Sequence, residues 1–189
     1  MPEQITRERA WALLTEHTQS PVLIRHALAV EAAMRAMAQR MAGDQEYWGA
    51  VGLLHDFDYE KHPTVEEHPF AGAQILKERG FDDTLVDDIL SHATYGGVAR
   101  DTPVRKALYA VDELSGFITA VALVRPSKSL SDVEPASVRK KMKDKAFARA
   151  VNRDDIVNGA AELGVDLDDH IRAVAESLKP VAVDLGLNT

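Results

Sequence analysis

The 189-residue sequence contains no cysteine, which excludes disulfide bonds, thiolate metal sites and a cysteine nucleophile. No apolar stretch approaches the roughly 20 residues that a membrane-spanning helix needs. The first residues carry both charges and lack the apolar segment of a secretion signal. We therefore expect a cytoplasmic protein without membrane contact, in which any metal site is built from His, Asp and Glu.

Aromatic residues are also scarce, at 6% of the chain, whereas 46% of residues are apolar and 28% are charged. This balance is typical of a globular domain, and the length is sufficient for one ordinary core. The net charge of -8 argues against general nucleic-acid binding. Residues 125–153 are the exception, with nine Lys or Arg against three acidic residues. This basic segment predicts a nearby anion, and a solvated charged face is the alternative.

Helix signals run along the whole chain, and no strand-length alternation of apolar and polar residues interrupts them. Proline at the first helical position predicts helices that start at Pro21 and Pro103, and a basic helix is expected over residues 138–147. Polar residues that favour helix starts precede seven of the expected helices: Thr6, Ser20, Asp44, Asp82, Thr102, Asn152 and Asp166. We expect a single all-α domain over residues 1–189.

The doublet His55-Asp56 ends a mostly apolar run at residues 50–54. Charging this pair inside a core is costly unless a partner compensates it, and a metal ion is the usual partner of a buried imidazole beside a carboxylate. A polar pair that meets solvent at a helix end is the alternative.

Four further residues fit a metal site with this doublet. His26 lies on the apolar stripe of its helix and Asp112 near the edge of another, while His68 and His92 lie at helix ends between them. A core histidine and a surface aspartate are the alternatives for the first two. All six side chains are enough for two ions bridged by Asp56, and such ligands suit Mn, Fe, Co, Ni or Zn. The remaining histidines are expected at the surface: His17, His62 and His170.

The order His26, His55-Asp56 and Asp112 on an all-helical chain resembles the HD superfamily of metal-dependent phosphohydrolases. The resemblance covers roughly residues 20–125 and implies an HD-type helical bundle, with residues 126–189 as a helical extension. It implies that the ordered set binds metal. His68 and His92 resemble the further ligands of branches that hold two ions.

This resemblance implies hydrolysis of a phosphoric ester in a small metabolite or nucleotide. Two departures separate the chain from known branches. Residues 94–98 read Thr-Tyr-Gly-Gly-Val, where cyclic-dinucleotide phosphodiesterases carry a Gly-Tyr-Pro signature. Tyr59 and Glu60 replace the acidic residues that alarmone hydrolases and helical nucleotidases carry after the doublet. The substrate and the oligomeric state stay open.

Within this hypothesis, Asp56, Asp58 and Lys106 are the candidate catalytic residues, although Asp58 is also readable as a solvated loop charge. Candidate cations for the substrate phosphate are Arg25, Lys128, Lys140 and Lys141. Two alternatives remain: a di-iron oxygenase of the same superfamily, and a metal-stabilised binding domain without turnover.

Overall fold

The computed structural model describes residues 5–189. Nine α-helices cover most of this range: α1 (Arg7–His17), α2 (Pro21–Arg40), α3 (Gln45–Leu54), α4 (Phe70–Glu78), α5 (Asp83–Leu90), α6 (Pro103–Leu123), α7 (Pro135–Met142), α8 (Arg153–Leu163) and α9 (Leu167–Leu178). Two short 3₁₀ helices, η1 (Leu130–Asp132) and η2 (Lys179–Val181), complete the described part, which contains no β-strand. The expected all-α class is therefore confirmed.

Helix starts follow the predicted caps. Five cap side chains accept a backbone N–H from the first turn of the helix that follows: Thr6, Asp44, Asp82, Asn152 and Asp166. A cap of this kind stabilises a helix by about 1 kcal/mol. Ser20 and Thr102 act differently, because their side chains make no capping bond and proline follows them in the first turn.

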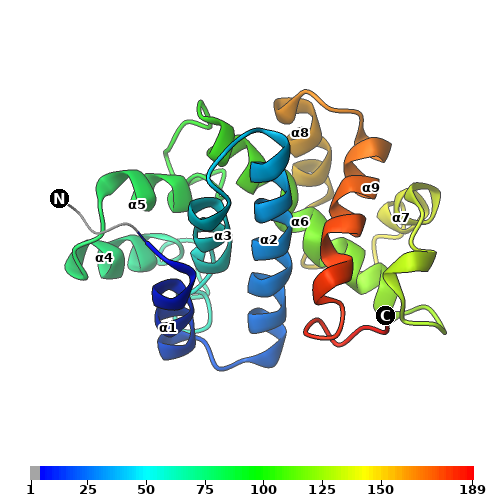
Figure 1. Ribbon diagram of the computed structural model, residues 1–189, viewed down its shortest axis with the longest axis horizontal. Coiled ribbons are helices and arrows are strands. Elements are labelled where there is room, and N and C mark those ends of the chain that lie inside the picture. Colours follow the sequence, from blue (N-terminus) through cyan, green and yellow to red (C-terminus); the bar gives the residue numbers. More distant parts are fainter. Residues whose placement is uncertain (1–4) are drawn as a thin grey trace.

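Helices α2, α3 and α6 form the centre of the molecule, with α1, α4 and α5 on one side and α7, α8 and α9 on the other (Figure 1). Met34 of α2, Leu54 of α3 and Leu114 of α6 are completely buried. Polar residues that sequence reasoning selected lie on two of these helices, His26 on α2 and Asp112 on α6, and His55 directly follows α3. The close packing of the three helices therefore brings together residues that are far apart in the chain.

The basic helix is shorter than expected, because α7 ends at Met142 rather than at residue 147. The guanidinium of Arg153 donates hydrogen bonds to carbonyl oxygens in the following stretch, including that of Ala148 at 2.7 Å. It also lies over the ring of Phe117, with 5.1 Å between Cζ and the ring centroid. These contacts hold residues 144–151 in turns that continue to α8.

Two histidines expected at the surface lie inside. His170 is only 3% exposed, and its Nε2 donates to the carbonyl oxygen of Ala110 at 2.8 Å. His17 is half-buried with its ring edge-on to Phe57, at 5.4 Å between centroids. Phe57, from the turns after α3, covers His17, whereas His170 lies on the buried face of α9 with Ile171 and packs toward α6. None of the helices in the described residues is long and apolar enough to cross a membrane.

Candidate metal centre

Three ligand atoms from three helices meet in one cluster, which we call the first triad. His26 lies on α2, His55 directly follows α3 and Asp112 lies on α6. His26 Nε2 is 3.1 Å from His55 Nε2 and 3.0 Å from Asp112 Oδ1. His55 Nε2 is 3.3 Å from the same oxygen.

The second triad consists of Asp56, His68 and His92. Asp56 lies two residues beyond α3, His68 precedes α4, and His92 follows α5. The Nε2 atoms of His68 and His92 are 3.1 Å apart. They lie 3.2 Å and 3.3 Å, respectively, from Asp56 Oδ1. The structure thus brings together all six predicted ligands, three in each triad.

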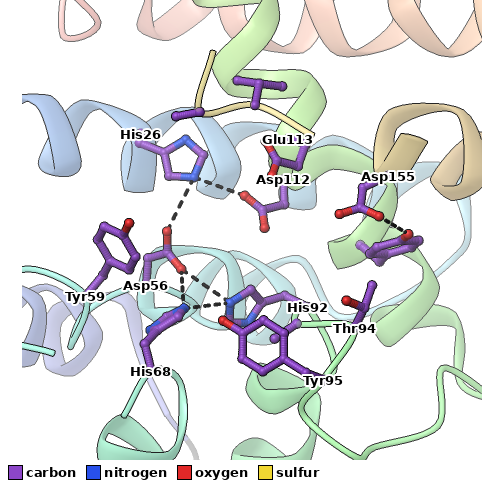
Figure 2. A pocket seen from close by; sticks show the side chains of 14 residues that line it. His26, Asp56, Tyr59, His68, His92, Thr94, Tyr95, Asp112, Glu113 and Asp155 are labelled. Atoms are coloured by element: carbon purple, nitrogen blue, oxygen red, sulfur yellow. Dashed lines mark hydrogen bonds and ion pairs between the residues drawn. The ribbon is translucent and has the colours of Figure 1, made fainter. Parts of the chain in front are cut away.

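Asp56 connects the two triads. Its Oδ1 belongs to the second triad, whereas its Oδ2 lies 3.4 Å from His55 Nε2 and 3.8 Å from His26 Nε2. Figure 2 shows this carboxylate between His26 above and His68 and His92 below. One carboxylate facing two clusters is the arrangement expected for two ions about 4 Å apart.

Backbone carbonyl groups fix the orientation of two rings. His55 Nδ1 is 2.7 Å from the oxygen of Gly52, and His92 Nδ1 is 2.7 Å from the oxygen of Ile89. A carbonyl oxygen can only accept, so each Nδ1 must donate. In a neutral ring the lone pair then remains on Nε2, the atom that points into the site.

A buried carboxylate fixes the third ring. Asp58 is 1% exposed, and its Oδ1 lies 2.8 Å from His68 Nδ1. Its Oδ2 accepts the backbone N–H of Gly72 at 2.8 Å. A Cβ at Gly72 would lie only 2.9 Å from Asp58 Cγ, so the close approach requires glycine. Asp58, predicted as a catalytic residue, is thus placed behind His68 and does not line the cavity.

The donor atoms fit metal ions. His68 and His92 point their Nε2 atoms at each other while both Nδ1 atoms face acceptors, so neutral rings place two lone pairs face to face. A cation held by both nitrogens and Asp56 would remove this repulsion. Ligands about 2.1 Å from one ion lie roughly 3.0 to 3.4 Å from one another at ordinary coordination angles, and the separations within both triads fall in this range.

Comparison with known families identifies the domain that carries the two triads. Residues 23–116 match the family model of the HD domain, and this range contains both triads. These residues form an HD domain. The predicted resemblance to the HD superfamily is therefore confirmed.

A known relative covers part of this HD domain protein. Over 84 residues, or 44% of the chain, the sequence is 31% identical to a tRNA (cytidine(56)-2'-O)-methyltransferase of Picrophilus torridus. The match spans 24% of that enzyme, so the chain corresponds to about a quarter of its length. No solved structure gives a significant match.

Opposite charges stabilise one another inside the HD site. Burial lowers the pKa of His55, but the carboxylates of Asp56 and Asp112 raise this pKa well above its usual value. Burial also lowers the pKa of His68, whereas hydrogen bonds with Asp56 and Asp58 raise it to about 9. Burial raises the pKa values of Asp56 and Asp112, yet the imidazoles hold both below the usual range. The site therefore attracts positive charge, whether protons or metal ions.

A cavity of about 270 Å³ opens onto the triads. Tyr59 and Tyr95 line it, and Figure 2 shows Tyr59 to the left and Tyr95 to the right of Asp56 and His68. The ring of Tyr59 packs edge-on to that of His68, with centroids 5.2 Å apart. Both tyrosines are partly exposed and form the mouth of the cavity.

Polar residues of the cavity wall that sequence reasoning missed include Tyr109, Glu113 and Asp155. Burial and the negative charge of Asp112 raise the pKa of Glu113 to about 7. Tyr109 donates its hydroxyl to Asp155 Oδ1 at 2.7 Å. The position of Glu113 directly after a predicted ligand was the only available signal. Asp155 lies on α8, so the segment after the HD domain completes the wall.

Two predicted cations of the HD region lie elsewhere. None of the residues lining the cavity in the described chain is Lys or Arg. Lys106 lies on α6, where its positive charge contributes to lowering the pKa of Glu162 on α8. Arg25 lines a neighbouring cavity rather than this one.

The predicted cations of the basic segment are also outside the cavity wall. Lys128 lies in the turn after α6, where its carbonyl oxygen accepts the N–H of Asn188 at 2.8 Å. Lys140 is exposed on α7. Lys141 places its Nζ 4.7 Å from the centroid of the Phe147 ring. The structure does not bring any of the three to the triads.

Proposed function

We propose that this HD domain protein is a metal-dependent phosphohydrolase that acts on a small phosphorylated molecule. The observation that carries this proposal is the pair of His/Asp triads joined by Asp56 beside a cavity of about 270 Å³. Two divalent ions bound there would lower the pKa of a water molecule and neutralise phosphate oxygens, which are the main needs of phosphoric ester hydrolysis.

The charge of the ligand set supports a phosphate monoester. With neutral imidazoles, Asp56 and Asp112 supply two negative charges against four positive charges of two divalent ions. The excess of positive charge matches a phosphate dianion. The positive charge of the two ions would take the place of Lys or Arg side chains, which the cavity wall lacks among the described residues.

The chain's own residues have distinct roles in this proposal. Asp56 faces both triads and would keep the two halves of the site in register. The two hydrogen bonds of Asp58 support a positioning role, in which it holds His68 with Nε2 toward the site. Tyr59 and Tyr95 restrict the mouth and would limit the access of water to a bound substrate.

A di-iron oxygenase is a second candidate. The cavity wall offers no Lys or Arg within the described residues, and the mixed imidazole and carboxylate ligands also suit iron. This reaction needs redox-active iron, whereas hydrolysis does not. Metal identity therefore separates the two candidates.

Metal content and phosphate release test the proposal together. The purified protein, with its metals counted by elemental mass spectrometry, is assayed for phosphate release from a panel of sugar phosphates, nucleotides and short alkyl phosphates. Asp56→Asn is the test variant. Asp132→Asn is the matched control, because Asp132 is exposed on η1 and lies outside the cavity.

About two Mn, Co, Ni or Zn ions per chain with phosphate release, both lost in Asp56→Asn and retained in the control, would support the phosphohydrolase. Two irons with substrate-dependent consumption of O2 would support the oxygenase instead. Bound metal without any product would leave a metal-stabilised binding domain and refute the proposal.

A further inference from the structure

A second cavity of about 360 Å³, which we call the side pocket, adjoins the cavity at the triads. Four residues line both spaces: His26, Glu113, Ala150 and Val151. In Figure 2, His26 and Glu113 lie along the side of the metal cavity that the side pocket shares. The two cavities are therefore neighbours that share part of their walls.

The imidazole of His26 forms the partition between the two spaces. Its Nε2 belongs to the first triad, at 3.0 Å from Asp112 Oδ1. A Cβ placed on Gly116, which lines the side pocket, would lie 3.4 Å from Nδ1 on the opposite edge of the ring. If Nε2 binds a metal, the neutral ring carries its proton on Nδ1 and offers it toward the side pocket.

His26 differs in this respect from the other ligand histidines. The Nδ1 atoms of His55, His68 and His92 each face a protein acceptor at 2.7 to 2.8 Å. The polar contacts of His26 all involve its Nε2. Among the described residues, none forms a hydrogen bond with its Nδ1. One hydrogen-bond donor therefore remains available at the boundary of the two cavities.

The rest of the side pocket is mainly apolar. Its wall includes small residues on one face of α6 and larger apolar side chains around them: Val22, Leu23, Gly116, Ala120, Leu123 and Leu185. Val22 and Leu123 are 71% and 40% exposed, so apolar surface at this opening meets water. An apolar group bound here would cover that surface, which is favourable in proportion to the area removed from water.

We propose that the side pocket binds an apolar group of the molecule whose phosphate lies at the triads, so that the substrate is an amphipathic phosphate ester. This inference rests on the proposed phosphohydrolase function. An oxygen of the substrate beside the phosphate accepts the Nδ1–H of His26, and an alkyl chain or ring continues along Gly116 and Ala120. Arg25 also lines the side pocket and is exposed, so its guanidinium would contact a second polar group of the substrate.

Non-hydrolysable probes test the side pocket separately from turnover. Methyl-, butyl-, hexyl- and octylphosphonate are titrated into the 189-residue protein loaded with two metal ions, and affinities are measured by calorimetry. Each methylene that becomes buried is expected to raise the affinity about fourfold until the pocket is full. The useful quantity is the ratio of octyl to methyl affinity.

Two variants locate the effect. Ala120→Leu fills the pocket from α6, and Leu123→Asp places a charge at its opening. Both are expected to lower the octyl-to-methyl ratio at least tenfold while metal content stays at two ions per chain. Ala161→Leu, at an exposed position of α8, adds the same side chain away from the pocket and serves as the control. Leu123→Asp keeps the test decisive if Ala120→Leu does not fold.

The outcomes separate this inference from the proposed function. Phosphonates that bind with affinity independent of chain length overturn the side-pocket assignment and leave the phosphohydrolase intact. Failure of every phosphonate to bind the metal-loaded protein overturns both. If the affinity does not depend on alkyl chain length and Leu123→Asp changes the oligomeric state, the pocket binds a second copy of the chain. This outcome overturns the substrate assignment.

Discussion

Asp58 shows how a single carboxylate acquires its role from what surrounds it. The sequence suggested a catalytic group or a solvated charge, because Asp58 follows the His-Asp doublet at the start of a polar stretch. In the structure it is buried against His68 and Gly72, and both of its oxygens are used. Only the return of α4 to the end of α3 creates this contact.

Replacement of Asp58 by Asn tests its positioning role. An amide has one accepting oxygen, so its NH2 group must face either the Nδ1–H of His68 or the N–H of Gly72. We expect the ion of the second triad to bind 10- to 100-fold more weakly, and the first ion to be retained. Metal titration by calorimetry, with ions counted by mass spectrometry, measures this change.

The exposed Asp132→Asn serves as the control for this substitution too. Two ions bound to Asp58→Asn with wild-type affinity would show that His68 does not depend on Asp58 for its orientation.

At the scale of elements, the caps predicted most helix boundaries correctly, because a capping side chain contacts the backbone only two or three residues away. The predicted end of the basic helix at residue 147 was wrong. Arg153, which lies beyond that expected helix, donates hydrogen bonds to carbonyl oxygens of the turns after α7. The packing of α8 on α6 could likewise not be predicted from local sequence patterns.

Gly159 is the residue that allows α8 to approach α6. A Cβ there would lie 2.7 Å from the Cα of Ala110 and 3.1 Å from the carbonyl oxygen of Tyr109. Because backbone atoms cannot move aside cheaply, Gly159→Leu is expected to lower the free energy of unfolding by about 1–3 kcal/mol. Urea unfolding measures this loss.

Ala161→Leu, on the exposed side of the same helix, is the control and should change the free energy of unfolding by no more than about 0.5 kcal/mol. Equal stability of the two variants would mean that α8 does not pack on α6 at Gly159.

For the whole molecule, metal binding is expected to stabilise the fold because the triads join α2, α3, α6 and the segments around α4 and α5. An ion at a hundred times its Kd contributes about 2.7 kcal/mol at one site. In a protein of this size that corresponds to a rise in Tm of roughly 5–10 °C per site. Thermal unfolding with excess Mn or Zn, and then with a chelator, measures the effect.

Asp56→Asn should show little of this metal-dependent rise, while Asp132→Asn should match the wild type. The proposed two-ion site is refuted if the wild-type Tm does not respond to any of the suitable ions.

The buried His170 makes the stability of the whole fold depend on pH. Burial lowers its pKa, the nearby charge of Arg40 adds to this, and the hydrogen bond to Ala110 opposes it. The unfolded chain takes up a proton on this ring below about pH 6.5, but the folded protein does so only at lower pH. The stability contribution is therefore present above pH 6.5 and is lost as the pH falls from there through the folded pKa.

His170→Gln removes this titration. The difference in free energy of unfolding between wild type and variant should shrink as the pH is lowered from 7.5 to 5.0, with metal chelated in both. Urea unfolding at several pH values measures it, and His62→Gln, at a side chain 33% exposed, is the control. A constant difference across this range would contradict the assignment.

The sequence by itself determined the helical class and the six candidate metal ligands of the HD site. Helix caps and apolar stripes act over a few residues, and His26, His55-Asp56 and Asp112 kept a recognisable order along the chain. Tertiary structure alone decided which atoms meet. It selected the two oxygens of Asp56 as the link between triads and placed Asp58 behind His68. It also left the metal cavity without a lysine or arginine from the described residues and opened a side pocket beside His26. These contacts join residues far apart in the chain, and the packing of whole helices, rather than any local pattern, sets their distances.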